Sequence, residues 1–323
     1  TRGRLQAYGG RGRAAVVALA GAALADLAPA RLDSGHGRAT FAANRREASL
    51  GGVRLGVNPT GPVDPDVPVL RVTAPDGRLR AVLFGYACHG TTLAARFTEV
   101  DSDFAGFAQR AIEAAHPGAT ALYLILCAGD QNPNPRGEYE HLERHGRELA
   151  GAVEAALSAE MEPVRPPVRT AHEVAELAFA PHTREAFEKE AAGADGQAST
   201  PHKKRRAQRM LEAYDRGEPV RTLPLQVQAI RLGGDFTLLG LSGEVVVDYA
   251  LRAKREFPAE NLVVAGYCND VSCYVPSLEV LRGGGYEPVT SMIYYGQPGP
   301  LSTNVEEEVF TAIHRTLRQA GAK

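Results

Sequence analysis

The stretch Leu79-Arg-Ala-Val-Leu-Phe-Gly-Tyr-Ala-Cys-His-Gly90 decides how the rest of the sequence is interpreted. Its apolar part, Ala81 to Tyr86, is typical of a short buried strand that follows the turn Pro75-Asp76-Gly77. Apolar character ends at Cys88, and His89 begins a polar run. A histidine at the mouth of a buried strand is held at the sheet edge, where α/β proteins keep ligand and metal sites. A lone histidine there is also consistent with a hydrogen-bonded structural role, so its neighbours decide.

The composition is that of an ordinary soluble globular protein. The 323 residues are 44% apolar and 23% charged, and this length suffices for a sizeable core. A net charge of -2 gives no support for nucleic acid or an acidic membrane as the main partner. Four cysteines without a C-x-x-C pair are too few for a disulfide framework, so we expect free, mostly buried thiols.

The N-terminal region permits two interpretations. Thr1 to Arg13 is basic and Gly-rich, and Ala14 to Ala25 is apolar, which together imitate a signal peptide. The favoured alternative is an Ala-rich amphipathic helix that ends before Pro29 and is too short to span a bilayer. The chain begins with Thr, so we expect its natural start to be missing and leave a secreted, periplasmic or cytoplasmic location open. The predicted apolar face carries Val16, Ala20, Ala23 or Leu24, and Leu27.

Alternating strand and helix patterns predict an α/β fold with mixed β-sheets flanked by helices, in a single domain over residues 1–323. Residues 180–222 differ because Lys, Arg, Glu and Ala dominate, and they predict a charged helical excursion on the surface. Gly35 to Arg46 is interpreted as one strand. The other predicted strands are 69–73, 81–86, 121–126, 225–232, 236–241 and 262–266, and the predicted helices are 104–115, 140–157, one after 244, and 304–319.

Polar side chains follow several of these apolar strands. His89 follows one, Asp130 a second, Glu244 a third, and the segment from Asn269 to Tyr274 a fourth. If the strands share a sheet, these groups converge on one edge of it. Imidazole, carboxylate and phenolate are suitable zinc ligands, and a zinc ion with an open position activates water. For Glu244 the alternative is structural, because Ser242-Gly243-Glu244 could head a helix and cap it.

Eight short motifs occur in an order that resembles the catalytic N-terminal domain of the neutral/alkaline, non-lysosomal ceramidases, in particular its shorter bacterial relatives of unassigned substrate. The resemblance runs from roughly residue 15 to residue 315, and each motif is weak alone. The motifs are Asn44-Arg45-Arg46, Asn58-Pro59, Tyr86-Ala-Cys-His89, Ser102-Asp103-x-x-Gly106, Ala128-Gly-Asp-x-x-Pro133, Gly243-Glu244, Tyr267-x-Asn269-x-x-x-x-Tyr274 and Gly285-Tyr286-Glu287.

This resemblance implies a zinc amidohydrolase whose metal is held by two His, a Glu and a Tyr. By motif, the metal ligands in this chain are His89, Glu244 and Tyr274. The residues with implied catalytic roles are Arg45, which holds the substrate or its oxyanion, Asp130 of the loop beside the metal, and Tyr286 near the scissile bond. The implied substrate is a small-molecule or lipid-like amide, without a nucleic-acid partner or a transmembrane segment, and the oligomeric state stays open.

Two departures from the family pattern matter for function. The first metal His of the family lies in an H-x-H-x-G-P type motif that is expected upstream of Thr1, so we expect this chain to lack one zinc ligand and to bind zinc weakly. The serine of the family's G-D-x-S-P loop is replaced by Asn132. A carboxamide cannot replace a serine as proton donor, but it can polarise a carbonyl by hydrogen bonding. We therefore expect hydrolysis of some amide or ester bond, and not a true ceramidase.

Two other functions stay open at this stage. The chain could be a non-catalytic, ceramidase-like binding or scaffold module with a relic metal site. It could also be a Cys-His hydrolase that uses Cys127 or Cys88, although Cys88 and His89 point to opposite sides if both lie on a strand. We expect the side chain of Asn132 to face the pocket of His89, where the alternative is a simple turn residue before Pro133.

Overall fold

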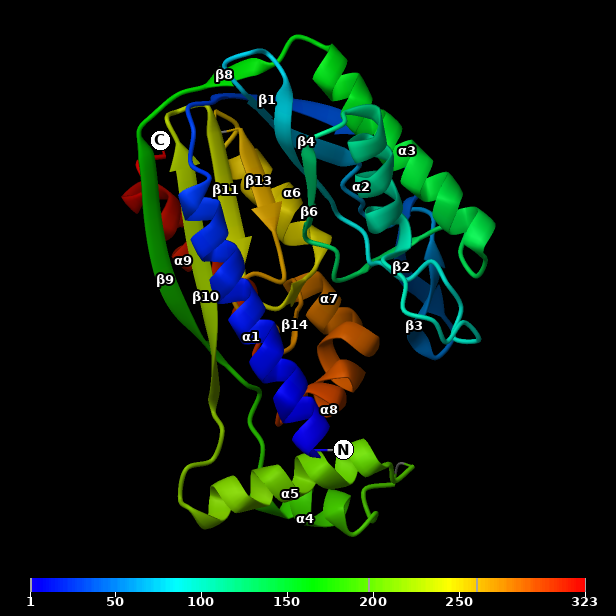
Figure 1. Ribbon diagram of the computed structural model, residues 1–323. Helices are drawn as coiled ribbons and strands as arrows, with labels where there is room; N and C mark the ends of the chain where they lie inside the picture. The colour runs from blue at the N-terminus through cyan, green and yellow to red at the C-terminus, as the bar shows by residue number, and fades with distance from the viewer. Residues whose placement is uncertain (1, 197, 260, 323) are drawn as a thin grey trace.

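The computed structural model describes residues 2–196, 198–259 and 261–322, and its two main β-sheets lie between layers of helices (Figure 1). The first sheet has the strand order β6-β5-β4-β1-β8, and the second has the order β13-β11-β10-β9. The first sheet is formed by β1 (Arg31–Arg38), β4 (Asp66–Thr73), β5 (Leu79–Tyr86), β6 (Thr120–Ile125) and β8 (Glu162–Val164). The second is formed by β9 (Val168–Ala178), β10 (Thr222–Leu232), β11 (Phe236–Leu241) and β13 (Leu262–Ala265).

Each sheet contains one parallel pair joined by a helical crossover, and these pairs position the candidate site. In the first sheet β5 and β6 are parallel and α2 (Asp103–Ala115) connects them. In the second sheet β11 and β13 are parallel and α6 (Val247–Glu256) connects them. A parallel pair needs such a crossover, and its two carboxyl ends lie at the same edge of the sheet. The remaining pairs of the two sheets are antiparallel.

Three hydrophobic clusters show that the layers follow the order helices, sheet, sheet, helices. Apolar side chains of both sheets pack together between them. They include Leu70 of β4 and Leu126 just after β6 from the first sheet, and Phe236 of β11 and Val263 of β13 from the second. The opposite face of the first sheet is covered by α2 and α3 (Tyr139–Ser158). The opposite face of the second sheet is covered by α6 and α9 (Val305–Gln319). Each sheet is buried on both faces, because its strands carry apolar side chains on both sides.

Two small sheets lie at the ends of the large ones. The strands β3 (Gly52–Asn58), β2 (Ala42–Ser49) and β7 (Gln131–Pro133) form one, with β2 in the middle. The parallel pair β12 (Glu244–Val245) and β14 (Tyr274–Val275) forms the other. Beyond β14 the chain continues in α7 (Leu278–Gly283), the π-helical turn η1 (Tyr286–Thr290) and α8 (Ser291–Tyr295).

The expected α/β class is confirmed, but one predicted strand is wrong, and neither the structural alternative for Glu244 nor the condition of a shared sheet is met. Gly35 to Arg46 forms two strands, β1 and β2, because the chain turns at residues 39–41. Glu244 does not head a helix: it lies in β12, and α6 begins three residues later with Val246 as its N-cap. The polar strand ends do not share one sheet, since His89 follows the first sheet and Glu244 the second.

Two helical segments stand apart from the layers. Residues 180–222 contain α4 (Arg184–Ala191) and α5 (Pro201–Asp215), which pack on each other around Phe187 and Met210 at the lower end of Figure 1. The predicted N-terminal helix is present as α1 (Arg2–Ala25), but its described side chains are all exposed, so no apolar face of it is buried. Within the described residues, none of the helices has both the length and the hydropathy needed to cross a bilayer.

Candidate functional site

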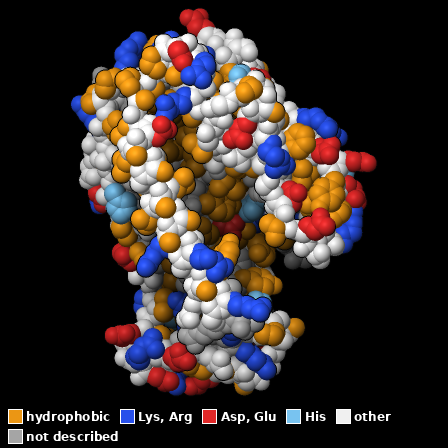
Figure 2. Space-filling view, in the orientation of Figure 1, with side chains coloured by type: hydrophobic (Ala, Val, Ile, Leu, Met, Phe, Trp, Pro, Cys, Tyr) orange, Lys and Arg blue, Asp and Glu red, His pale blue; other side chains and the backbone are white. Residues whose placement is uncertain are grey.

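The ends of the two parallel strand pairs meet at one place in the molecule. His89 follows β5, Asp130 and β7 follow β6, Glu244 follows β11, and Tyr267 follows β13. A backbone hydrogen bond of 2.8 Å from Gly129 N to Val245 O joins the end of one sheet to the end of the other. Figure 2 shows a hollow in the middle of this face, with apolar side chains on its floor and acidic and histidine side chains at its edge.

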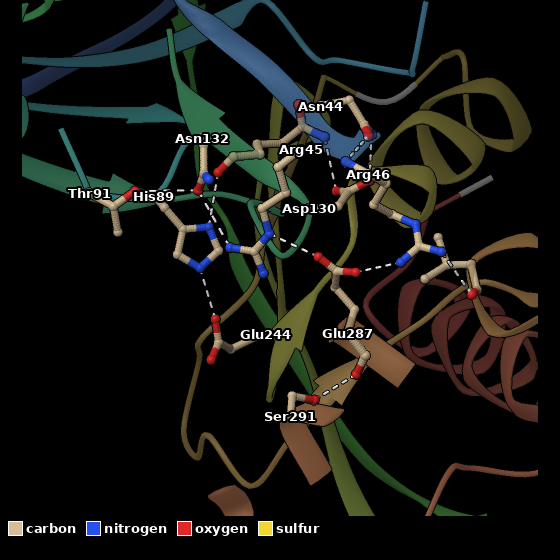
Figure 3. A network of polar contacts seen from close by, with 12 residues as sticks. Asn44, Arg45, Arg46, His89, Thr91, Asp130, Asn132, Glu244, Glu287 and Ser291 are labelled. Atoms are coloured by element: carbon tan, nitrogen blue, oxygen red, sulfur yellow. Dashed lines mark hydrogen bonds and ion pairs between the residues drawn. The ribbon is translucent and has the colours of Figure 1, made fainter. Parts of the chain in front are cut away.

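His89 and Glu244 form the centre of the site. The imidazole Nε2 lies 2.9 Å from Glu244 Oε2, and the imidazole Nδ1 lies 3.0 Å from the backbone oxygen of Gln131 (Figure 3). A carbonyl oxygen only accepts, so Nδ1 carries a proton and donates it. Nε2 therefore presents a lone pair to Glu244 in the neutral ring. Two acceptor atoms, Nε2 and Oε2, would then face each other at 2.9 Å. Their contact is favourable if Nε2 carries a proton, or if a cation contacts both atoms.

Three tyrosines surround the carboxylate of Glu244. The Tyr267 hydroxyl lies 3.1 Å from His89 Nε2 and donates to Glu244 Oε2 at 3.2 Å, and the Tyr295 hydroxyl donates to Glu244 Oε1. Tyr274, opposite Glu244 in the β12–β14 pair, stacks with His89 at 6.5 Å between ring centroids. Burial raises the pKa of all three tyrosines, so they stay phenols near neutral pH. Burial opposes ionisation of Glu244, but hydrogen bonds from His89 and the tyrosines lower its pKa overall.

A buried ion cluster fixes Arg45 beside this centre. Glu287, which is 0% exposed, accepts a 2.9 Å hydrogen bond from Arg45 Nε and a second hydrogen bond from Arg46 Nη1. Arg46 also donates to the backbone oxygen of Gly284 at 2.8 Å. The Arg45 guanidinium carbon lies 5.3 Å from the ring centroid of Tyr274 and 5.5 Å from that of Tyr286, a cation–π contact with each of two rings that also touch each other. Its Nη2 is buried and has no hydrogen-bond partner among the described residues. An unsatisfied buried donor of this kind is suited to a ligand oxygen.

The amide of Asn132 belongs to the same cluster. Its Oδ1 accepts hydrogen bonds from Arg45 Nη1 at 3.4 Å and from Thr91 Oγ1 at 3.3 Å (Figure 3). Arg45 can only donate, so this contact assigns Oδ1 and leaves the Nδ2 group of Asn132 available as a donor. Asn132 lies in β7, opposite Ala43 of β2, and not in a free turn. These contacts place the amide of Asn132 beside Arg45 and Thr91, and its expected position in the pocket of His89 stays a prediction.

Asp130 lies in a buried hydrogen-bond network beside Arg45. Its carboxylate is 1% exposed and accepts hydrogen bonds from Asn44 Nδ2 at 2.8 Å and from the Val247 backbone nitrogen at 2.9 Å. Burial raises its pKa, against the hydrogen bonds from Gln131 and Val247. Its backbone oxygen accepts from Arg45 N at 2.8 Å. These contacts join β2, β7 and the start of α6, and they make Asp130 a support of Arg45; a catalytic role for Asp130 stays a prediction.

The cysteines do not form a nucleophilic pair with His89. Burial raises the pKa of both the Cys88 and the Cys127 thiol well above the ordinary value. The Cys88 thiol donates to the backbone oxygen of His89, and the Cys127 thiol donates to that of Val264. A buried, protonated thiol is a poor nucleophile, so the geometry disfavours the Cys-His hydrolase.

The donor set fits a zinc ion only in part. The 2.9 Å between His89 Nε2 and Glu244 Oε2 lets both atoms bind one ion at the roughly 2.0 to 2.2 Å of zinc bonds. The Nδ1–H to carbonyl contact of His89 is the support that metal-binding histidines usually have. Across the described residues, however, no cluster of three or more His, Cys, Asp or Glu side chains is placed to hold a metal. A third protein donor must therefore be a tyrosine hydroxyl or come from outside the described residues.

Sequence reasoning assigned no role to three members of the cluster, namely Tyr267, Glu287 and Tyr295, although the first two stand in the quoted motifs. Tyr267 follows directly on β13, so the rule that singled out the other strand ends could have found it. Glu287 and Tyr295 lie in η1 and α8, where no apolar periodicity or strand end precedes them. Only the structure could place these two residues.

Comparison with solved structures supports a ceramidase-like fold. The neutral ceramidase from Pseudomonas aeruginosa matches with a TM-score of 0.64 and 16% sequence identity, over 92% of this chain and 53% of that one. A ceramidase complexed with C2 matches with a TM-score of 0.61 and 16% identity, over 92% of this chain and 54% of that one. The chain thus spans about half the length of these structures. No protein-family profile matches the sequence, and no curated protein matches it either.

Proposed function

We propose that this chain is a zinc-dependent hydrolase of an amide or ester bond, ceramidase-like in fold but acting on a substrate other than ceramide. The observation that carries the proposal is the convergence of His89 and Glu244 with the unpartnered Nη2 of the buried Arg45. The first pair offers a place for a metal and a water, and the guanidinium offers a donor for a carbonyl oxygen. Hydrolysis of a carbonyl compound needs both. The ceramidase resemblance of the sequence and the fold gives the same reaction class.

His89 and Glu244 would hold the zinc ion, with Tyr274 as the predicted phenol ligand. When bound, the ion would lower the pKa of a water to roughly 7 and so supply a nucleophile at neutral pH. The protein groups do the rest. Glu287 holds Arg45 through Nε, so that Nη2 remains available to a substrate oxygen on which negative charge develops. Asn132 Nδ2 supplies a second donor, because Arg45 and Thr91 occupy the oxygen of its amide.

The tyrosine hydroxyls hold protons at defined atoms around Glu244. Tyr267 and Tyr295 donate to the two carboxylate oxygens, and their raised pKa values keep those protons in place near neutral pH. Glu244 is thereby fixed in orientation and kept ionised. Because Asn132 stands where ceramidases have a serine, the site has no hydroxyl proton donor at this position. It keeps a hydrogen-bond donor for the carbonyl, the Nδ2 group of Asn132.

The test combines zinc binding with hydrolysis of a panel of chromogenic amides and esters. His89→Ala and Glu244→Gln should each lower zinc affinity in equilibrium dialysis by at least tenfold and reduce kcat/KM by 10²-fold or more. The chain offers a matched control, because His116 and Glu154 form a second His–Glu pair at 3.0 Å between α2 and α3. His116→Ala should leave zinc binding and hydrolysis unchanged. Equal zinc affinity in the His89→Ala and His116→Ala variants would reject the metal site.

The second candidate is a non-catalytic binding module with a relic metal site. It is favoured by the donor count, since only His89 and Glu244 of the usual metal-binding types meet here among the described residues. This candidate predicts that the chain binds amides through Arg45 but does not hydrolyse them at saturating zinc. Turnover that depends on Glu244 would exclude it.

A further inference from the structure

A cavity of about 280 Å³ adjoins the candidate site at Asn132. Its walls come from the three-stranded sheet β3-β2-β7 and from the segment after β7. It is lined by Ala43, Leu55, Gly56, Val57, Asn132, Pro133, Asn134 and Arg136. Asn132 is the shared member, because it contacts Arg45 and Thr91 in the site and also forms part of the cavity wall. A substrate with its carbonyl at Arg45 would reach the cavity by passing Asn132.

The walls of this cavity are apolar, although they are open to solvent. Leu55 is 52% exposed and Val57 is 45% exposed, and Pro133 and Ala43 complete the apolar lining. When a ligand covers large aliphatic side chains on an edge strand, burial of their surface favours binding by about 25 cal/mol for each Å² removed from water. Such a patch beside a polar site is typical of a ligand groove.

The lining of the cavity includes one cation, Arg136, for which no anionic partner is found among the described residues. Arg136 is exposed, and no ion pair or hydrogen bond of its side chain is recorded among the described residues. Arg96, by contrast, pairs with Glu138 and donates to the backbone oxygen of Gly137. The remaining polar wall residues, Asn132 and Asn134, are uncharged. The cavity is therefore apolar with one positive charge and no negative charge.

We propose that this cavity is the subsite for a substrate arm that is a short aliphatic chain ending in a carboxylate. The proposal rests on the proposed function, since it places the scissile carbonyl at Arg45 and Asn132. At roughly 30 Å³ for each water-sized group, the volume holds about nine non-hydrogen atoms, enough for four or five methylenes and a carboxylate. Arg136 would pair with that carboxylate, and Leu55, Val57 and Pro133 would cover the methylenes.

The experiment uses three amides with the same six-carbon acyl chain and different ends: N-methylhexanamide, the mono-N-methylamide of adipic acid, and 6-amino-N-methylhexanamide. Calorimetric titration measures binding to the 323-residue chain, so the result does not depend on turnover. The anionic amide should bind at least fivefold more tightly than the neutral one, and the cationic amide should bind most weakly. Added salt should reduce the difference, because Arg136 is exposed.

Variants separate this inference from the proposed function. Arg136→Gln should remove the preference for the anionic amide and leave the neutral one unaffected, and Arg136→Glu should reverse the preference. Leu55→Ser, which removes apolar surface without adding a charge, should weaken binding of all three, while Arg78→Gln, at a remote exposed arginine that pairs with Asp76, should change nothing. Equal affinities for the three amides, or a preference unchanged in Arg136→Gln, would overturn the subsite. Loss of hydrolysis with the preference retained would overturn the proposed function alone.

Discussion

At the scale of single residues, Glu287 is the carboxylate on which the candidate site depends most. It is fully buried and neutralises two buried arginines, and within the described residues it is the one carboxylate that accepts hydrogen bonds from both guanidiniums. Replacing it would leave Arg45 and Arg46 as uncompensated charges. We predict that Glu287→Gln lowers the free energy of unfolding by about 3 kcal/mol, the usual cost of breaking a buried ion pair. Urea unfolding measures this loss.

The matched control for Glu287 is Glu279, an exposed carboxylate in α7. Glu279→Gln should change the free energy of unfolding by less than about 0.5 kcal/mol. If Glu287 also positions Arg45, the Glu287→Gln variant should bind substrate more weakly than the Glu279→Gln variant in the absence of urea, where both variants are folded. A Glu287→Gln variant as stable as the Glu279→Gln variant would contradict this account.

Asn132 gives a second prediction at this scale. Because its amide oxygen is occupied by Arg45 and Thr91, its Nδ2 is the atom offered to a substrate. Asn132→Ala should lower kcat on the native amide or ester tenfold to a thousandfold, the range for losing one oxyanion donor. Asn132→Ser should raise activity on N-acyl sphingosine above background. Unchanged kinetics of the Asn132→Ala variant would mean that this asparagine only shapes β7.

Single residues were predicted well where a strand pattern pointed to them. His89 and Glu244 were found because each follows an apolar strand, and the structure brings the two into contact at 2.9 Å. The roles of Glu287 and Tyr295 were not predicted, because these residues lie in short, irregular helical turns that only tertiary packing places beside Glu244 and Arg45. The metal roles of His89, Glu244 and Tyr274 and the catalytic roles of Arg45, Asp130 and Tyr286 remain predictions.

At the scale of elements, α3 packs unusually close to β1. A Cβ atom on Gly37 of β1 would lie 2.2 Å from the backbone oxygen of Ala152 in α3, and backbone cannot move aside cheaply. Gly37→Ala should therefore lower the free energy of unfolding by about 2 kcal/mol through overpacking. Thermal or urea unfolding tests this.

The same helix offers the opposite case at Gly151. No atom lies within 4 Å of a Cβ placed there, and the position is on the exposed side of α3. Gly151→Ala should stabilise the protein by about 0.5 to 1 kcal/mol, because alanine loses less backbone entropy in a helix. If both substitutions changed stability in the same direction, close packing of α3 on β1 would not be the cause.

The elements themselves were largely predictable from periodicity, and their ends were not. The helices α2, α3 and α9 begin within one residue of their predicted starts, because amphipathic spacing is strong in each. The predicted strand from Gly35 to Arg46 is two strands because residues 39–41 are a connection between separate sheets, which alternation alone does not reveal. Glu244 was linked to a helix because α6 follows so soon after it.

At the scale of the whole molecule, a polar network ties the two main sheets together. His36 of β1 contacts Asp66 of β4 at 2.8 Å through Nδ1 and Asn261, just before β13, at 2.9 Å through Nε2. Lys254 of α6 donates to Asp66 and to Asp64. The hydrogen bond to Asp66 raises the pKa of His36 above its ordinary value, against the effects of burial and Lys254.

This network predicts a pH dependence of stability. A raised folded-state pKa means that the contribution of His36 is complete below its unfolded pKa of about 6.5 and is lost as pH rises through the folded pKa. The free energy of unfolding should therefore fall between pH 6 and pH 8.5, and it should fall less in His36→Gln. Urea titrations at the two pH values measure both slopes. The effect should be modest, because the His36 side chain is 43% exposed. Identical slopes in the two proteins would contradict it.

The pairing of the two sheets was the part of the whole fold that the sequence could not predict. Apolar strands indicate burial on both faces, but they do not say which sheet a strand joins. The strand ends were expected to meet because they share a sheet; they meet because two sheets pack face to face with their parallel pairs aligned.

The place where those sheets meet also sets the order of events when the chain folds. The groups at the site come from positions as far apart as Arg45 and Tyr295, and Gly129 joins the two halves through Val245. Contacts so distant in sequence are expected to form late in folding. During synthesis, residues up to Tyr295 must therefore leave the ribosome before the complete site can form. A ligand that binds there holds the finished assembly together and does little for either half alone.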